Sequence, residues 1–180
     1  MGSQVLVRAL AAAARLQFTD SRALPRLGEV LLGYGKESPS IVRLTLLGME
    51  PFDPRDAREA AKAGAIELGV PEPSPADAAN FVGAIIGTAL ICRRLDARAA
   101  TRGAYRLVVA AGYDVGRPLV TLYGLDDAWD AGWAGPNDQI ERQTREAAQE
   151  LVDRLLEVGR ADLTDSEWEL LRDVFVLRAF

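Results

Sequence analysis

An apolar run in the middle of the chain constrains the fold more than any other feature of the sequence. Residues 81–92 read FVGAIIGTALIC, with Thr88 the single polar side chain among them. Just upstream, Ser74 can cap a helix and Pro75 suits its first turn. A helix that is hydrophobic on every side belongs inside a protein. The run is shorter than a membrane span requires, and two arginines follow it. The sequence therefore predicts a central buried helix.

Small residues on this helix predict that another helix packs against it at close range. Ala79, Gly83 and Gly87 recur every four residues and so lie along one side. A second helix is predicted over residues 54–68, with Asp53 as its N-cap. Because the link between the two helices is short, we expect an antiparallel pair. The expected inner face of the second helix is made almost entirely of small residues: Ala57, Ala60, Ala61, Gly64, Ala65 and Leu68.

Periodicity and capping signals predict most of the remaining helices. These cover residues 4–17, 24–32, 41–47 and 137–158, and a last helix that begins at Thr164 and continues to the C-terminus. Residues 124–137 are predicted to be a loop or a broken helix. Residues 97–123 leave two alternatives open, a helix or a β-hairpin within 105–123. We therefore expect a mainly α protein, a single domain over residues 1–180, built as an irregular bundle of about six to seven helices.

The net charge and the cysteine content limit the kinds of binding partner and the cellular compartment that we expect for this protein. The chain has 21 Lys and Arg against 26 Asp and Glu, a net charge of −5. Proteins that bind nucleic acids through their phosphates are usually basic, so we do not expect nucleic acid as a binding partner. The single cysteine, Cys92, cannot form an intramolecular disulfide, which favours the cytoplasm. It falls in the apolar run and is expected in the core. No membrane association is predicted.

The absence of histidine is the most informative negative feature. It removes the commonest general base, the usual metal ligand and the Ser-His and Cys-His pairs of nucleophilic enzymes. Carboxylates, two lysines, tyrosines and arginines remain for chemistry, as in glycosidases. The composition thus favours a protein that is not an enzyme, and no cofactor is expected.

Three aspartates form the most site-like cluster. Asp126, Asp127 and Asp130 offer carboxylates within five positions, and oxygen ligands of this kind hold Ca²⁺ or Mg²⁺. Helical spacing would bring Trp129 beside Trp133. The stretch lacks the alternating ligands and terminal glutamate of an EF-hand loop. It is predicted to be either a cation site or an acidic turn anchored by two buried tryptophans.

The last helix carries more apolar residues than one-sided packing requires. Its apolar positions include Trp168, Leu171, Phe175 and Phe180, and only a thin polar strip separates them. Large exposed apolar patches mark interaction sites. Two interpretations stay open: deep docking into the helix's own domain, or an interface with a second subunit or partner.

Together these observations predict a cytoplasmic, non-enzymatic protein-interaction module. An adaptor, an immunity-type inhibitor and an assembly subunit all fit this description, and a homodimer is expected. The alternative is a protein that binds a small molecule or a divalent ion, or a histidine-free carboxylate enzyme, with its site near residues 113–133.

Overall fold

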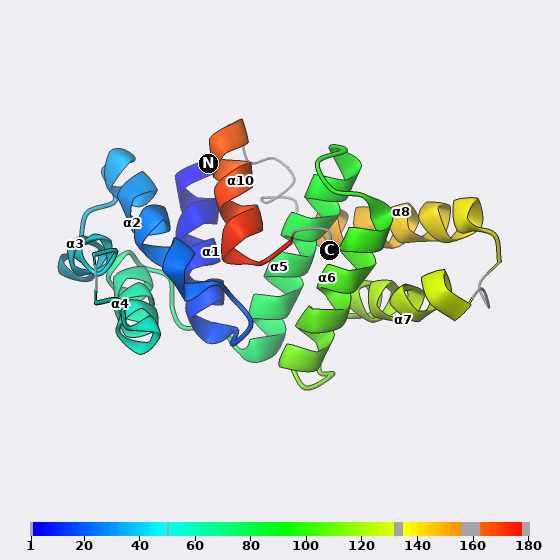
Figure 1. The fold of residues 1–180 in the computed structure, drawn as a ribbon, viewed down its shortest axis with the longest axis horizontal. Coiled ribbons are helices and arrows are strands. Elements are labelled where there is room, and N and C mark those ends of the chain that lie inside the picture. Colours follow the sequence, from blue (N-terminus) through cyan, green and yellow to red (C-terminus); the bar gives the residue numbers. More distant parts are fainter. Residues whose placement is uncertain (1, 50, 132–134, 156–162, 178–180) are drawn as a thin grey trace. The chain divides into compact units, whose positions relative to one another are not determined.

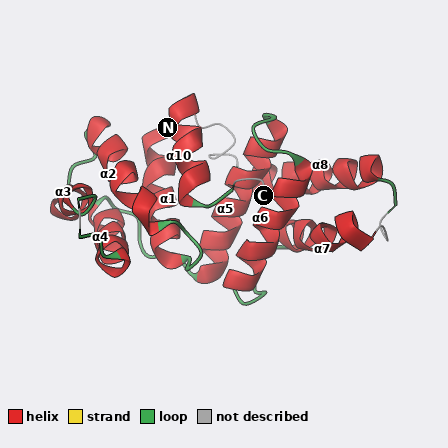
Figure 2. Ribbon diagram, in the orientation of Figure 1, coloured by secondary structure: helices red, strands yellow, loops and turns green. Residues whose placement is uncertain are grey.

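The computed structural model describes residues 2–49, 51–131, 135–155 and 163–177. In these residues it has nine α-helices and one 3₁₀ turn, η1 (Ser21–Ala23), and no strand (Figures 1 and 2). The helices are α1 (Gly2–Arg15), α2 (Leu24–Gly33), α3 (Pro39–Leu46), α4 (Pro54–Glu67), α5 (Pro75–Ile91), α6 (Ala97–Ala110), α7 (Arg117–Ala131), α8 (Asn137–Arg154) and α10 (Asp165–Val174). The prediction of a mainly α fold is confirmed, and the number of helices exceeds the predicted six to seven.

Of the two alternatives left open for residues 97–123, the helix is confirmed and the possible β-hairpin within 105–123 is wrong, because α6 and α7 occupy that segment. Asp96 caps α6 by accepting a hydrogen bond from the backbone N–H of Ala99 at 2.7 Å. Along α6, Leu107 and Val108 are buried while Val109 is exposed, as expected of one buried helical face. Strand preference of β-branched residues is a weak signal, and tertiary packing overrides it here. Residues 124–137 were predicted to be a loop or a broken helix; a loop over the whole stretch is wrong, since α7 continues to Ala131.

Helix starts that were predicted from capping residues are confirmed. The hydroxyl of Ser38 accepts a hydrogen bond from the N–H of Ile41, and α3 begins at the following proline. The carboxylate of Asp53 likewise accepts from the N–H of Arg55 at 2.7 Å. At the start of α10, Thr164 and Glu167 form the reciprocal pair of a capping box. These signals depend only on neighbouring residues, so sequence alone can reveal them.

The helices group into two compact units, each with its own core. Unit 1 comprises residues 1–74 and 161–176, and unit 2 comprises residues 75–160 and 177–180. Both contain a helix with most of its side chains buried, α1 in unit 1 and α5 in unit 2. The single domain predicted over residues 1–180 is not tested by this grouping and stays a prediction.

Unit 1 is organised around α1, which packs against α4 and α2. Helix α3 packs against α2 and α4, and α10 packs against η1 and α2. A methyl group added at Gly64 would lie 2.5 Å from the end of the Ile41 side chain, so α4 and α3 are in close contact. The face of α4 that is made of small residues therefore packs against other helices of unit 1.

Unit 2 is organised around α5, which contacts α6 and α8 while α7 contacts both of these helices (Figure 1). A methyl group added at Gly83 would lie 3.0 Å from Leu119 of α7, and one at Gly87 would lie 2.9 Å from the carbonyl oxygen of Ala148 in α8. The predicted pairing of α4 with α5 through their small residues is therefore wrong. Close packing was predicted correctly, but α7 and α8 supply it for α5 because they belong to the same unit.

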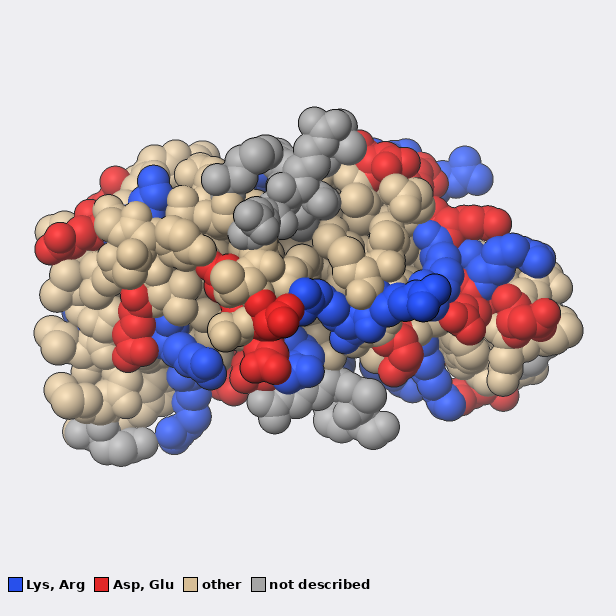
Figure 3. Space-filling model, turned by 90° about the horizontal axis from the view of Figure 1, so that it is seen from above, with Lys and Arg blue, Asp and Glu red and all other residues tan. Residues whose placement is uncertain are grey.

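Two further surface features follow from the fold. Cys92 is exposed, contrary to the prediction, because α5 ends at Ile91 and the chain turns through Arg93 with a positive φ of 57°. Basic and acidic side chains are interleaved on the face shown in Figure 3. In the described part of the chain, no helix combines the length and the apolar character that crossing a bilayer demands.

Candidate functional site

The outward face of the α6–α7 pair carries a ladder of side-chain contacts between the two helices. Arg98 pairs with Asp130 at one end of the ladder. One turn further along α6, Arg102 pairs with Asp126, one turn back along α7. The next contact joins the rings of Tyr105 and Tyr123. The partners follow in opposite order along the two helices, and the ladder changes from ionic at one end to aromatic at the other.

At the ionic end of the ladder, charged side chains of α6 pair with charged side chains of α7. Asp126 is only 4% exposed, and its Oδ2 lies 3.2 Å from Nη1 of Arg102. Burial raises the pKa of Asp126, the Arg102 guanidinium lowers it, and the carboxylates of Asp127 and Asp130 raise it again, with a net upward shift. Arg102 also lies 4.0 Å from Asp130, so one guanidinium serves two carboxylates.

The three aspartates predicted as cation ligands are not brought together as a ligand set. In the described residues, no group of three or more His, Cys, Asp or Glu side chains could hold a metal ion. Asp126 and Asp130 face arginines instead, whereas Asp127 is exposed. Helix α6 places two arginines opposite Asp126 and Asp130, so these carboxylates form ion pairs, and the cation site stays a prediction.

Of the two tryptophans predicted to anchor this stretch, the structure describes only Trp129. Trp129 packs against a buried cluster of Leu125, Ala128 and Ile140, as the anchored-turn interpretation expected. Its Nε1 is buried and has no hydrogen-bond partner among the described residues. Trp133 lies outside the described residues. The anchor is therefore a helical one, on α7, rather than a turn.

The aromatic end of the ladder forms an exposed patch that we call the tyrosine surface. Tyr105 stacks on Tyr123, with ring centroids 5.4 Å apart and planes 14° from parallel, and Tyr113 meets Tyr123 edge-on at 5.8 Å. Val109 lies one turn after Tyr105 on the same side of α6, Tyr113 lies in the turn that follows α6, and Val120 lies one turn before Tyr123 on α7. The tyrosine surface consists of these five residues.

Most of the tyrosine surface is exposed, and the hydroxyl of Tyr123 stays protonated. Tyr113 is 60% exposed, and Val109 and Val120 are 44% and 42% exposed. The pKa of Tyr123 is raised, first by its electrostatic interaction with Tyr113 and further by burial, by neighbouring Tyr105 and by Asp127. The Tyr123 phenol is therefore neutral at physiological pH and can donate a hydrogen bond. Tyr113 has a positive φ of 67°, which places its ring at the turn after α6.

Sequence reasoning missed the tyrosine surface because it left residues 105–123 open between a helix and a β-hairpin and so assigned them no common face. A signal was present: Tyr105, Val109 and Tyr113 recur every four residues, the spacing of one helical face. The partners on α7 carry no comparable signal, since only the tertiary structure sets which residues of α7 lie opposite α6.

The residues predicted as an interface on the last helix lie inside unit 1. Leu171 and Phe175 are fully buried, and Trp168 is half-buried. The N–H of Asp20 donates to the carbonyl oxygen of Val174, which ties this helix to the start of η1. Phe180 lies outside the described residues. Placing an interface at Leu171 and Phe175 is therefore wrong, and docking into the chain's own core accounts for their apolar character.

The buried carboxylate of Glu167 holds the first turn of α10 in place through hydrogen bonds. The Tyr34 hydroxyl donates to Oε1 of Glu167 at 2.6 Å, and the backbone N–H of Thr164 donates to its Oε2 at 2.6 Å. Burial by itself raises the pKa of Glu167, but these hydrogen bonds, together with one from the Thr164 hydroxyl, outweigh it and hold the pKa below the ordinary value. Glu167 thus has a structural role.

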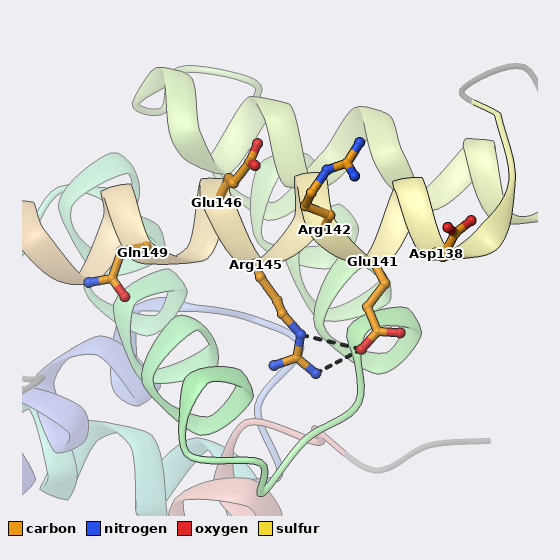
Figure 4. Close-up of a pocket in the computed structure, with 6 residues that line it drawn as sticks. All are labelled: Asp138, Glu141, Arg142, Arg145, Glu146 and Gln149. Atoms are coloured by element: carbon orange, nitrogen blue, oxygen red, sulfur yellow. Dashed lines mark hydrogen bonds and ion pairs between the residues drawn. The ribbon is translucent and has the colours of Figure 1, made fainter.

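Two hollows lie away from the tyrosine surface. A hollow of about 420 Å³ follows one face of α8 and is lined by Asp138, Glu141, Arg142, Arg145, Glu146 and Gln149 (Figure 4). A much smaller one, of about 10 Å³, lies in unit 1 beside Glu72, whose carboxylate pairs with Lys62 at 2.6 Å and with Arg15 at 3.9 Å. The smaller hollow has little room for more than a water molecule.

Comparisons with known proteins add no functional information. No protein family, no curated protein and no solved structure matches this chain.

Proposed function

We propose that the chain is a cytoplasmic, non-enzymatic helical module that binds a protein partner through the tyrosine surface. The observation that carries this proposal is the exposure of Tyr105, Val109, Tyr113 and Val120, with both exposed tyrosine rings in contact with the half-buried ring of Tyr123. The cytoplasmic location rests on the single cysteine, as above.

Tyrosine suits a binding surface for physical reasons. Its ring gives a large apolar contact at a small cost in side-chain entropy, and its hydroxyl can still form a hydrogen bond at the edge of the contact. Tyrosine is accordingly enriched at the centres of interfaces. Here Tyr123 is held by ring contacts with both Tyr105 and Tyr113, so the surface is arranged before a partner arrives. Pre-arrangement lowers the entropy lost on binding.

The neighbouring ionic end supports a role in specificity. Arg98 and Arg102 are about half exposed in their pairs with Asp130 and Asp126. Charges at the rim of an interface affect the association rate and the choice of partner more than the affinity. A partner that covers the tyrosine surface would meet Arg98, Arg102 and Asp130 at its edge.

The test is a comparative affinity capture with the intact protein. Val109→Asp places a charge inside the tyrosine surface, and the control is Leu46→Asp, which alters an exposed apolar residue of unit 1. Both variants should remain folded by circular dichroism. We expect at least one protein to be retained by the parent and by Leu46→Asp but lost with Val109→Asp. Equal retention by all three would refute the proposal.

The alternative function near residues 113–133, binding of a small molecule or divalent ion or a carboxylate-based enzyme, stays a prediction. It differs from the proposal in a direct measurement. Saturable quenching of tryptophan fluorescence by Ca²⁺, Mg²⁺ or Mn²⁺, lost in Asp127→Asn, would favour it, whereas an interaction module should give a flat titration.

A further inference from the structure

Helix α8 presents a charged face whose pattern is complementary to itself when reversed. Along this face the order is acid, acid, base, base: Asp138, Glu141, Arg142 and Arg145. All four residues line the hollow of about 420 Å³, and the first three are exposed (Figure 4). A hollow over a helix face offers room for side chains of a second helix.

The charges on this face are incompletely neutralised within the chain. Glu141 pairs with Arg145 through Oε1 and Nη2 at 2.8 Å, and Nη1 of Arg145 also lies 3.4 Å from the carbonyl oxygen of Leu90. Asp138 and Arg142 have the ideal spacing for an ion pair four residues apart, yet neither forms one among the described residues. In Figure 4 the two side chains point in different directions. One acid and one base are thus available to a partner.

We propose that α8 pairs antiparallel with α8 of a second copy of this chain about a two-fold axis. With the axis between Glu141 and Arg142, Glu141 of each copy lies opposite Arg142 of the other. In the same register Asp138 of each copy lies opposite Arg145 of the other. Each of these two contacts occurs twice across the two-fold axis, so the dimer contains four ion pairs.

The charges also discriminate against a neighbouring register. A displacement that opposes Arg142 to Arg145 would also oppose Glu141 to Glu146 and Asp138 to the uncharged Gln149, so the contacts between charged side chains would all join like charges. Such like-charge contacts are unfavourable and suppress the wrong register. In the proposed register Glu146 lies opposite Asn137, which carries no charge.

The pairing should be weak and sensitive to salt. Exposed ion pairs contribute little each and are screened by electrolyte. We therefore expect a dissociation constant in the micromolar range at low ionic strength, rising as salt is added. This surface is separate from the tyrosine surface, so the failure of either proposal leaves the other standing.

The test is a charge swap measured by sedimentation of the intact protein at low ionic strength. Arg142→Glu should raise the dimer dissociation constant at least about tenfold, since it turns two attractive contacts into repulsive ones. The double variant Glu141→Arg with Arg142→Glu re-forms both contacts across the axis and should restore the dimer. Arg26→Glu, the same charge change at an exposed position of α2, is the matched control and should leave the dimer unchanged.

Three results would overturn the proposal. The first is a parent protein that stays monomeric at low ionic strength up to high micromolar concentration. The second is a dimer that Arg142→Glu does not weaken, which would place the contact elsewhere. The third is a double variant that remains as weak as the single one, because a partner other than a second α8 would not compensate.

Discussion

Gly87 allows α8 to approach the central helix of unit 2, and replacing it should measure how tightly the two are packed. A methyl group at this position would lie 2.9 Å from the carbonyl oxygen of Ala148 and 3.2 Å from a methyl group of Val152. The first contact is with backbone, so no side-chain rotation can relieve it. Helix α8 would have to move away from α5.

The magnitude follows from two opposing effects. Alanine favours a helix over glycine by about 1 kcal/mol. Overpacking a well-filled core costs about 1–3 kcal/mol. Gly87→Ala should therefore lose up to about 2 kcal/mol of unfolding free energy. Gly124→Ala is the matched control, because Gly124 also lies within a helix but has no atom within 4 Å of the added methyl group. It should gain about 1 kcal/mol.

The difference between the two variants isolates the steric cost, since the helix-propensity gain is common to both. For a chain of this size, each 1 kcal/mol shifts the Tm by about 2–4 °C. Thermal unfolding followed by far-UV circular dichroism should place Gly87→Ala below the parent and Gly124→Ala above it. If both variants melted equally above the parent, α8 would not lie against Gly87 and the packing of unit 2 described here would be refuted.

Two further predictions concern unit 1. Because its hydrogen bonds hold the pKa of Glu167 below the ordinary 4.5, the ionised side chain stabilises the fold above that pH, and this contribution is lost as the pH falls through the lowered value. Glu167→Gln should thus cost about 1–3 kcal/mol at neutral pH in urea unfolding, and its deficit should shrink on acidification; a deficit independent of pH would contradict this role. Phe175 is fully buried, so Phe175→Ala should cost about 3–5 kcal/mol, whereas a residue at a dimer interface would instead change the sedimentation of a protein that remains folded.

The sequence alone determined the local features of this protein. The mainly helical fold, the burial of the central helix and the starts of α3, α4 and α10 at Ser38, Asp53 and Thr164 were all predicted correctly. Each of these depends on residues within one or two turns, because a cap bonds to backbone three positions away and an apolar face repeats every 3.6 residues.

Only the tertiary structure decided which helices meet. Small residues predicted that α5 packs closely, but the partner is α8, which lies far along the chain, rather than the preceding helix. Asp126 and Asp130 resembled metal ligands until α6 placed Arg98 and Arg102 opposite them, and Phe175 resembled an interface residue until it was found in the core. The position of a residue in the helical repeat fixes the face of the helix on which its side chain lies. The role of that side chain depends on which element packs against that face, and no local sequence pattern encodes which element that is.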